Sequence, residues 1–134
     1  MKISTKKMIS FIILLLLLIA LICGVVYLKK VTDYKQAVGE TTFGEIDIAD
    51  VSNGIYIGEY DVNFIYAKVE VTVEDGEIVS INILEHRHEH GKAAETVIEK
   101  IIDEQKIDVD AVSGATNSST VIKKAVENAL KGEP

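Results

Sequence analysis

The sequence predicts an α+β fold, with an N-terminal transmembrane helix followed by a small antiparallel sheet covered by two helices. Three observations support this prediction: an uncharged apolar segment opens the chain, an alternating segment fills its middle, and two segments of helical periodicity follow. Because the strands precede the helices, sheet and helices are expected to form separate layers around one core. The chain then divides into an anchor (residues 1–30), a linker (31–53) and a folded domain (54–132).

The predicted anchor is the segment 8–28, which contains one polar residue, Ser10, and no charged residue. At ~1.5 Å per residue, a helix of this length spans roughly 31 Å, enough to cross the hydrocarbon core of a bilayer. The apolar stretch exceeds the core of a secretory signal, and no small-x-small cleavage site follows it. We therefore expect a retained single-pass anchor whose helix 8–28 contacts membrane lipid. Lysines flank both ends, so the charges indicate orientation only weakly. The N-terminal position favours an exported domain.

Cys23, the one cysteine, allows a second interpretation of the anchor as a lipoprotein signal. Ile22 before it is bulky, however, where such sites carry a small residue. A small apolar residue within a membrane helix is the favoured interpretation of Cys23.

The remainder of the chain is strongly acidic. Residues 31–134 hold all 21 Asp and Glu but only 9 of the 14 Lys and Arg, which gives a net charge of −12. Such a surface repels nucleic acid and anionic lipid headgroups. The composition favours a domain held near a membrane without lying on it, and no nucleic-acid partner is expected.

The strands are predicted from alternation and turn residues. Residues 55–57 form a short apolar strand, and Gly58 and residues 61–63 are expected to be turns. A long alternating run then extends over residues 64–84 and is interrupted once, at 74–76. This pattern is typical of a β-hairpin with one buried face.

The register of this hairpin follows from its two faces. A two-residue turn at 75–76 would pair Val71 with Ser80 and mix apolar with polar side chains on each face. A three-residue loop at 74–76 pairs Val71 with Val79 and collects the apolar residues on one face. Since a slip of one residue moves every side chain to the other face, the three-residue loop is predicted.

Two amphipathic helices are predicted after the hairpin. The first runs from about Lys92 to Gln105, and the second, with Ser118 or Ser119 as its N-cap, ends near Gly132. Apolar residues recur at helical spacing on one face of each. In the first helix they are Ala94, Val97, Ile98, Ile101 and Ile102, and in the second Ile122, Ala125, Val126 and Ala129.

The loop before the second helix, residues 110–119, reads Asp-Ala-Val-Ser-Gly-Ala-Thr-Asn-Ser-Ser. Small side chains there allow an anion to approach a helix N-terminus, whose unpaired N–H groups carry partial positive charge. Such a loop suits a phosphate; an ordinary capped turn is the alternative. It has neither the Gly-Lys-Ser/Thr ending of a nucleotide-binding P-loop nor the Gly-x-Ser-x-Gly spacing of a hydrolase elbow.

Asp110 to Thr116, followed by Ser118 and Ser119, resembles the flavinylation motif of the FMN-binding domain family. That family includes the FMN-carrying subunits of the sodium-pumping quinone reductase and of ferredoxin:NAD reductase complexes, and small membrane-anchored or lipoprotein members in bacteria. The resemblance implies that an FAD:protein FMN transferase joins FMN to Thr116 by a phosphoester bond. It implies that Asp110 belongs to the motif recognised by that transferase. The residues implied to hold the phosphate are Ser113, Gly114, Ala115, Ser118 and Ser119.

The resemblance covers nearly the whole folded domain, with two departures. Residues 54–58 resemble the family's opening strand, and residues 69–83 its central hairpin. The large subunits carry Glu-Thr-Pro-Gly after the hairpin, where this chain has His-Glu-His-Gly at 88–91. Residues 61–64 replace a glycine-rich loop. The environment of the flavin ring is therefore not assigned by the resemblance.

The three histidines form a cluster of their own, His86, His88 and His90. If the strand continues past Leu84 they share one face, and imidazoles at this spacing can ligate zinc or copper. A polar strand end is the favoured alternative, since a fixed fourth ligand is missing from the pattern. Histidines beside a flavin could also stabilise negative charge or relay protons.

The sequence and its resemblance together favour an electron carrier rather than an enzyme with its own substrate. Covalent FMN would supply the redox chemistry, and a membrane-bound donor, quinone-linked or a multisubunit reductase, would supply the electrons. Two alternatives stay open: an exported binding module of the same fold that is never flavinylated, and a metal-binding protein that uses the histidine cluster.

Overall fold

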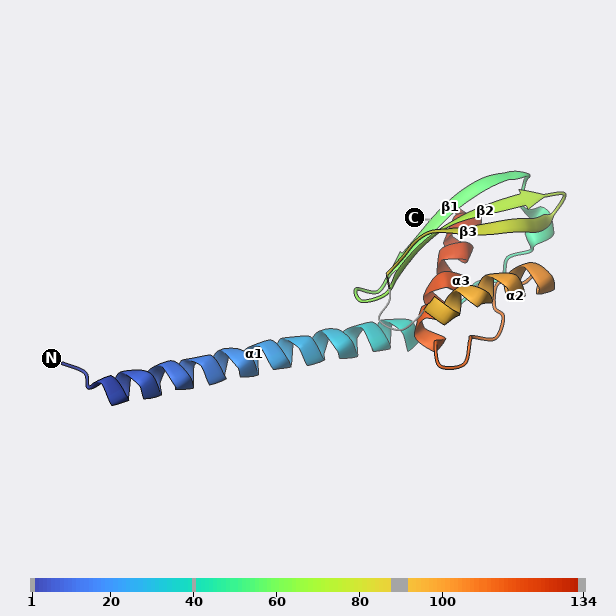
Figure 1. Ribbon diagram of the computed structural model, residues 1–134. Coiled ribbons are helices and arrows are strands. Elements are labelled where there is room, and N and C mark those ends of the chain that lie inside the picture. Colours follow the sequence, from blue (N-terminus) through green and yellow to red (C-terminus); the bar gives the residue numbers. More distant parts are fainter. Residues whose placement is uncertain (1, 40, 88–91, 133–134) are drawn as a thin grey trace. The chain divides into compact units, whose positions relative to one another are not determined.

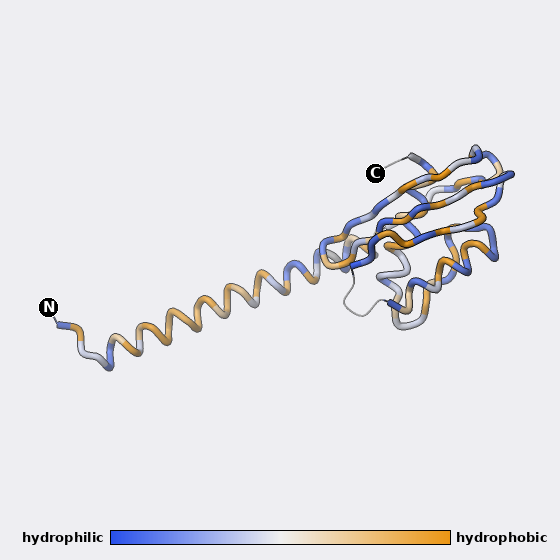
Figure 2. Tube along the Cα trace, turned by 45° about the horizontal axis from the view of Figure 1, so that its top comes forward, coloured by the Kyte–Doolittle hydropathy of each residue, from blue (hydrophilic) through white to orange (hydrophobic). Residues whose placement is uncertain are grey.

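A computed structural model describes residues 2–39, 41–87 and 92–132, and the chain divides into two compact units, Met1–Asp33 and Tyr34–Pro134. The first unit is the larger part of helix α1 (Thr5–Gly39), which covers the predicted anchor and continues beyond it (Figure 1). The apolar side chains of α1 between Met8 and Leu28 are exposed, and Figure 2 shows this stretch as the longest hydrophobic segment of the chain. By length and composition, α1 can cross a membrane.

The second unit contains a sheet and the remaining helices, which confirms the predicted α+β class. Its elements are a 3₁₀ turn (Ile48–Asp50), β1 (Gly54–Asp61), β2 (Tyr66–Glu74), β3 (Glu77–Arg87), a second 3₁₀ turn (Lys92–Thr96), α2 (Val97–Glu104) and α3 (Thr116–Lys131). The strands form one antiparallel sheet in the order β1-β2-β3. Figure 1 shows α2 and α3 on the same face of that sheet.

The core lies between this face and α3. The central strand β2 presents alternate residues to the helices, and these are fully buried: Ala67, Val69, Val71 and Val73. The apolar stripe predicted for the last helix packs against them and is also buried. Apolar burial of this kind is the main favourable term in folding, so alternation in the strand and helical spacing in α3 specify the two faces that meet.

The predicted three-residue hairpin loop is wrong. Glu74 pairs with Glu77, so the turn has two residues, Asp75 and Gly76, both with positive φ, as such turns require. A β-bulge at Val79 then shifts the register. The bulge restores the common apolar face that the longer loop was expected to provide.

Gly58 was predicted to be a turn, and this too is wrong. It pairs with Val69 in the middle of β1, which continues to Asp61. A Cβ atom on Gly58 would lie 2.7 Å from Ala129 Cα and still closer to the backbone of Ala125. The glycine is therefore required because α3 rests directly on the backbone of β1, where no side chain fits.

Replacing Gly58 with alanine is expected to destabilise the domain by about 2 kcal/mol, a typical cost of overpacking a core. The added methyl group meets helix backbone, so α3 must move away from β1. Urea denaturation of the two proteins would measure the difference. Gly54→Ala is the matched control, since its added Cβ meets only ordinary contacts with the Tyr56 ring. Equal midpoints for Gly58→Ala and the wild type would contradict the close packing of α3 on β1.

The two predicted helices are present, with differences at their starts. The first begins as the 3₁₀ turn at Lys92 and becomes α-helical at Val97, and it ends at Gln105, which has φ +50°. The second begins at Thr116, with Ala115 at the N-cap position, so neither Ser118 nor Ser119 is the N-cap. Gly132, with φ +70°, ends α3 as predicted.

Candidate functional site

The motif loop, residues 110–115, turns sharply into α3. The N–H of Ala115 donates to the carbonyl of Val112 at 2.9 Å, which closes a four-residue turn. Gly114, the third residue of this turn, has φ +81°, as the third residue of a type II turn requires. A Cβ on Gly114 would meet no atom of the described residues within 4 Å, so the glycine is needed for its backbone conformation and not to avoid a clash.

Thr116 is the first residue of α3 and is exposed to solvent. Ala115 at the N-cap position provides no side-chain hydrogen bond, and no acidic residue occurs in the first turn. The N–H groups of that turn, which carry partial positive charge, are therefore not capped by a carboxylate of the N-cap residue or of the turn itself. A phosphate esterified to Thr116 would meet favourable electrostatics here, and the fit of an FMN phosphate rests on this arrangement.

Ser119 is fully buried and holds the motif loop onto α3. Its Oγ accepts a hydrogen bond from the Val112 N–H at 3.0 Å and donates one to the Ala115 carbonyl at 2.8 Å. Because the Ser119 hydroxyl links the backbone of Val112 to that of Ala115, it fixes the shape of the loop from its buried side.

The predicted site residues separate into two groups by exposure. Four are exposed around the start of α3: Asp110, Ser113, Gly114 and Thr116. Three are buried: Ala115, Ser118 and Ser119. The exposed group is therefore accessible from solvent, whereas the buried group is not.

Lys123 also supports the loop, and the sequence analysis did not identify it. This lysine of α3 is 5% exposed. Its Nζ donates to the Val109 carbonyl at 2.8 Å and lies 3.2 Å from Asp108 Oδ1. The ammonium also lies 4.8 Å from the centre of the Phe43 ring, within cation–π range. The sequence contained one indication of this role: Lys123 follows Thr116 by seven residues, and this spacing places both residues on one side of a helix.

A second segment, residues 42–44, is attached to the same side of α3. Glu127 is fully buried, and its carboxylate accepts hydrogen bonds from the Gly44 N–H at 2.8 Å, Lys124 at 3.0 Å and Lys131 at 2.5 Å. Burial raises the pKa of Glu127, but the bonds from Lys131, Gly44 and Lys124 outweigh burial, so its pKa lies below the ordinary value. This part of the predicted linker is thus held against the domain.

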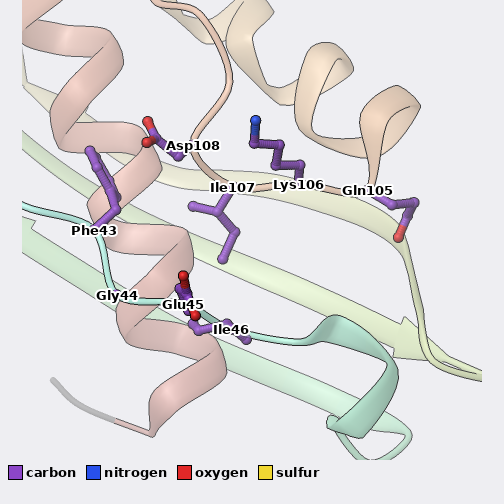
Figure 3. Close-up of a pocket in the computed structure, with 8 residues that line it drawn as sticks. All are labelled: Phe43, Gly44, Glu45, Ile46, Gln105, Lys106, Ile107 and Asp108. Atoms are coloured by element: carbon purple, nitrogen blue, oxygen red, sulfur yellow. The ribbon is translucent and has the colours of Figure 1, made fainter.

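Beside the second segment lies a hollow of about 420 Å³ (Figure 3). Residues 43–46 form one wall and residues 105–108 the other, and the side chain of Ile107 points into the space between them. Phe43 and Asp108 lie beside α3 in this view, where Lys123 contacts both. The hollow is lined by residues outside the motif 110–119.

The histidine cluster is described only in part. Strand β3 continues to Arg87, and a bulge at Leu84 aligns His86 with the buried Ala67. The His86 side chain is 2% exposed, with Nδ1 3.1 Å from Glu95 Oε1. His88 and His90 lie outside the described residues. Within 2–39, 41–87 and 92–132, no group of three His, Cys, Asp or Glu side chains is arranged to hold a metal ion.

Fold and site together define a small α+β domain with an exposed threonine where a phosphate is favoured. Residues 66–131 match the sequence model of the FMN-binding domain family. The match includes strands β2 and β3, helices α2 and α3, and the complete motif loop. Residues 66–131 are therefore assigned to the FMN-binding domain family, and the cofactor that this match supports is FMN. No solved structure matches the chain.

Proposed function

We propose that this chain is a membrane-anchored, extracytoplasmic electron-transfer flavoprotein that carries FMN in a phosphoester bond to Thr116. The observation that supports this proposal most is the exposed hydroxyl of Thr116 at the N-terminus of α3. The motif loop around it resembles the family's flavinylation motif, and the family match covers this segment.

The attachment needs a donor of FMN, which we take to be FAD bound by an FAD:protein FMN transferase. The hydroxyl oxygen of Thr116 forms a bond to the phosphorus of the FMN half as the pyrophosphate bond of FAD breaks. AMP is the leaving group, and the hydroxyl proton is released to solvent. The protein gains the mass of FMN minus one water. Asp110 is exposed two residues before the turn and is available for recognition by the transferase.

The residues of the chain have three roles in this proposal. Thr116 binds the cofactor, the N–H groups of the first turn of α3 stabilise its phosphate, and Ser119 fixes the loop. FMN, when bound, supplies one- and two-electron chemistry. The apolar helix α1 would keep the domain beside a membrane-bound donor, such as a quinone-linked or multisubunit reductase. A covalent bond would prevent loss of the flavin outside the cytoplasm.

The test is expression of the full chain with and without an FMN transferase, followed by intact mass measurement and denaturing electrophoresis. We expect a mass increase of FMN minus water only when the transferase is present, and a flavin fluorescence band that survives denaturation. A chain that stays unmodified beside an active transferase would refute covalent attachment. Flavin that is bound but lost on denaturation would support a dissociable FMN-binding module instead.

A further inference from the structure

One side of α3 carries buried polar side chains in register with Thr116. Ser119, Lys123 and Glu127 follow Thr116 by 3, 7 and 11 residues, and these spacings place all four on one side of the helix. The three are 0%, 5% and 0% exposed. They are buried because two segments lie over them: residues 108–112 over Ser119 and Lys123, and residues 42–44 over Lys123 and Glu127.

Asp110 lies between the two points at which residues 108–112 are held to α3. Lys123 holds Asp108 and the Val109 carbonyl, and Ser119 holds the Val112 N–H. Asp110 itself is exposed, with its carbonyl 3.5 Å from Lys100 Nζ on the surface. Its position relative to Thr116 therefore depends on these two contacts.

A lysine is an unusual choice for this position if stability is the only requirement. Removing an ammonium group from water is costly, and an apolar side chain of similar volume often serves a buried site as well or better. Three contacts of Lys123 offset the cost of removing its ammonium group from water: the ion pair with Asp108, the hydrogen bond to the Val109 carbonyl and the contact with the face of the Phe43 ring. These contacts are directional, so they specify where the loop backbone lies in a way that apolar packing does not.

We infer that Lys123 is a positioning residue of the flavinylation site, which holds Asp108 and Val109 so that Asp110 and Thr116 are presented together to the transferase. This inference rests on the proposed function of Thr116. Phe43 completes the environment of Lys123, so the segment that follows α1 in the chain contributes to the support of the motif loop.

The test compares full-length variants, purified in detergent micelles, as substrates for an FMN transferase with FAD. We expect Lys123→Met to lower kcat/KM for flavinylation by about 10-fold or more, because small displacements of reacting groups have effects of this size. Lys123→Arg keeps a donor to the Val109 carbonyl and should restore most of the rate. Asp108→Asn, at a side chain that is 63% exposed, should fold normally and show a smaller loss.

Lys124→Met is the matched control. Lys124 is the next residue, contacts Phe43 at 5.9 Å and bonds Glu127 and the Thr42 carbonyl, but it makes none of the contacts of Lys123 with Asp108 and Val109. Its variant should be flavinylated at the wild-type rate. Equal losses in Lys123→Met and Lys124→Met, or a folded Lys123→Met with wild-type kcat/KM, would overturn the inference.

Amide hydrogen exchange of the unmodified proteins gives a readout that does not depend on flavinylation. Exchange in residues 108–112 should accelerate in Lys123→Met and in Asp108→Asn and stay unchanged in Lys124→Met. Unchanged exchange in both of the first two variants would contradict the positioning role. A wild type that accepts no FMN would refute the proposed function alone, because the exchange measurement would still decide whether Lys123 holds the loop.

Discussion

Replacement of Thr116 by alanine is expected to abolish covalent FMN completely, the largest effect predicted for any substitution in this chain. The substitution removes the oxygen that would be bonded to the FMN phosphorus, and no neighbouring hydroxyl takes the same place at the start of α3. Ser119 is buried with its hydroxyl engaged, and Ser118 is 5% exposed. The measurement is intact mass after coexpression with the transferase, with peptide mapping of the modified site in the wild type.

Thr120→Ala is the matched control for this substitution. Thr120 lies one turn along the same helix, and its hydroxyl bonds the Thr116 carbonyl at 3.0 Å. The same side-chain change there should leave the FMN mass increase intact. A mass increase that persists in Thr116→Ala would assign the attachment elsewhere, and the exposed Ser113 would be the next residue to replace.

Replacement of Glu127 by alanine is expected to destabilise the domain by about 3 kcal/mol, which lies at the lower end of the range for a broken buried ion pair. The lower end applies because Lys124 and Lys131 keep 21% and 33% of their side chains exposed and regain water. The Gly44 N–H also loses its acceptor, so residues 42–44 should detach from α3. Urea denaturation would measure the stability, and proteolysis near residue 44 would report the detachment.

The pH dependence of this effect has a definite sign. Because the pKa of Glu127 is lowered in the folded protein, its contribution is fully present above the ordinary value of 4.5 and is lost as pH falls through the lower folded value. The stability difference between wild type and Glu127→Gln should therefore shrink in acid. Glu99→Gln, at an exposed residue of α2, is the control and should show no such change. A difference that stays constant into acid would contradict the ionised, hydrogen-bonded state of Glu127.

The hairpin shows where pattern-based prediction was sufficient and where it was not. Alternation correctly indicated that Val71 and Ile81 share the buried face. It did not distinguish a three-residue loop from a two-residue turn followed by a bulge. The two registers differ by two residues, so they place the same side chains of β2 and β3 on each face. The choice depends on the local backbone, where Asp75 and Gly76 both adopt positive φ and Val79 is extruded.

Gly58 illustrates a second limit of reasoning from local sequence. A glycine next to an apolar strand is a common turn signal. Here its requirement comes from the backbone of α3, a helix that begins 58 residues later in the chain. A close approach between two elements produces no pattern in the sequence around the glycine. Only the packed structure therefore shows that Gly58 is required for helix packing and not for a turn.

The sequence by itself determined the apolar helix, the order of strands and helices, the apolar faces of the hairpin and α3, and the motif loop at residues 110–116. Each of these depends on residue spacing or on a contiguous motif. Only the tertiary structure decided the roles of Ser119, Lys123 and Glu127, whose polar side chains would be expected to face solvent on an isolated helix. They are buried because residues 42–44 and 108–112 cover them, and the desolvated groups then find hydrogen-bond partners in those two segments. Such pairing joins parts of the chain that are distant in sequence, and it is the physical reason that helical periodicity alone did not reveal this support beneath Thr116.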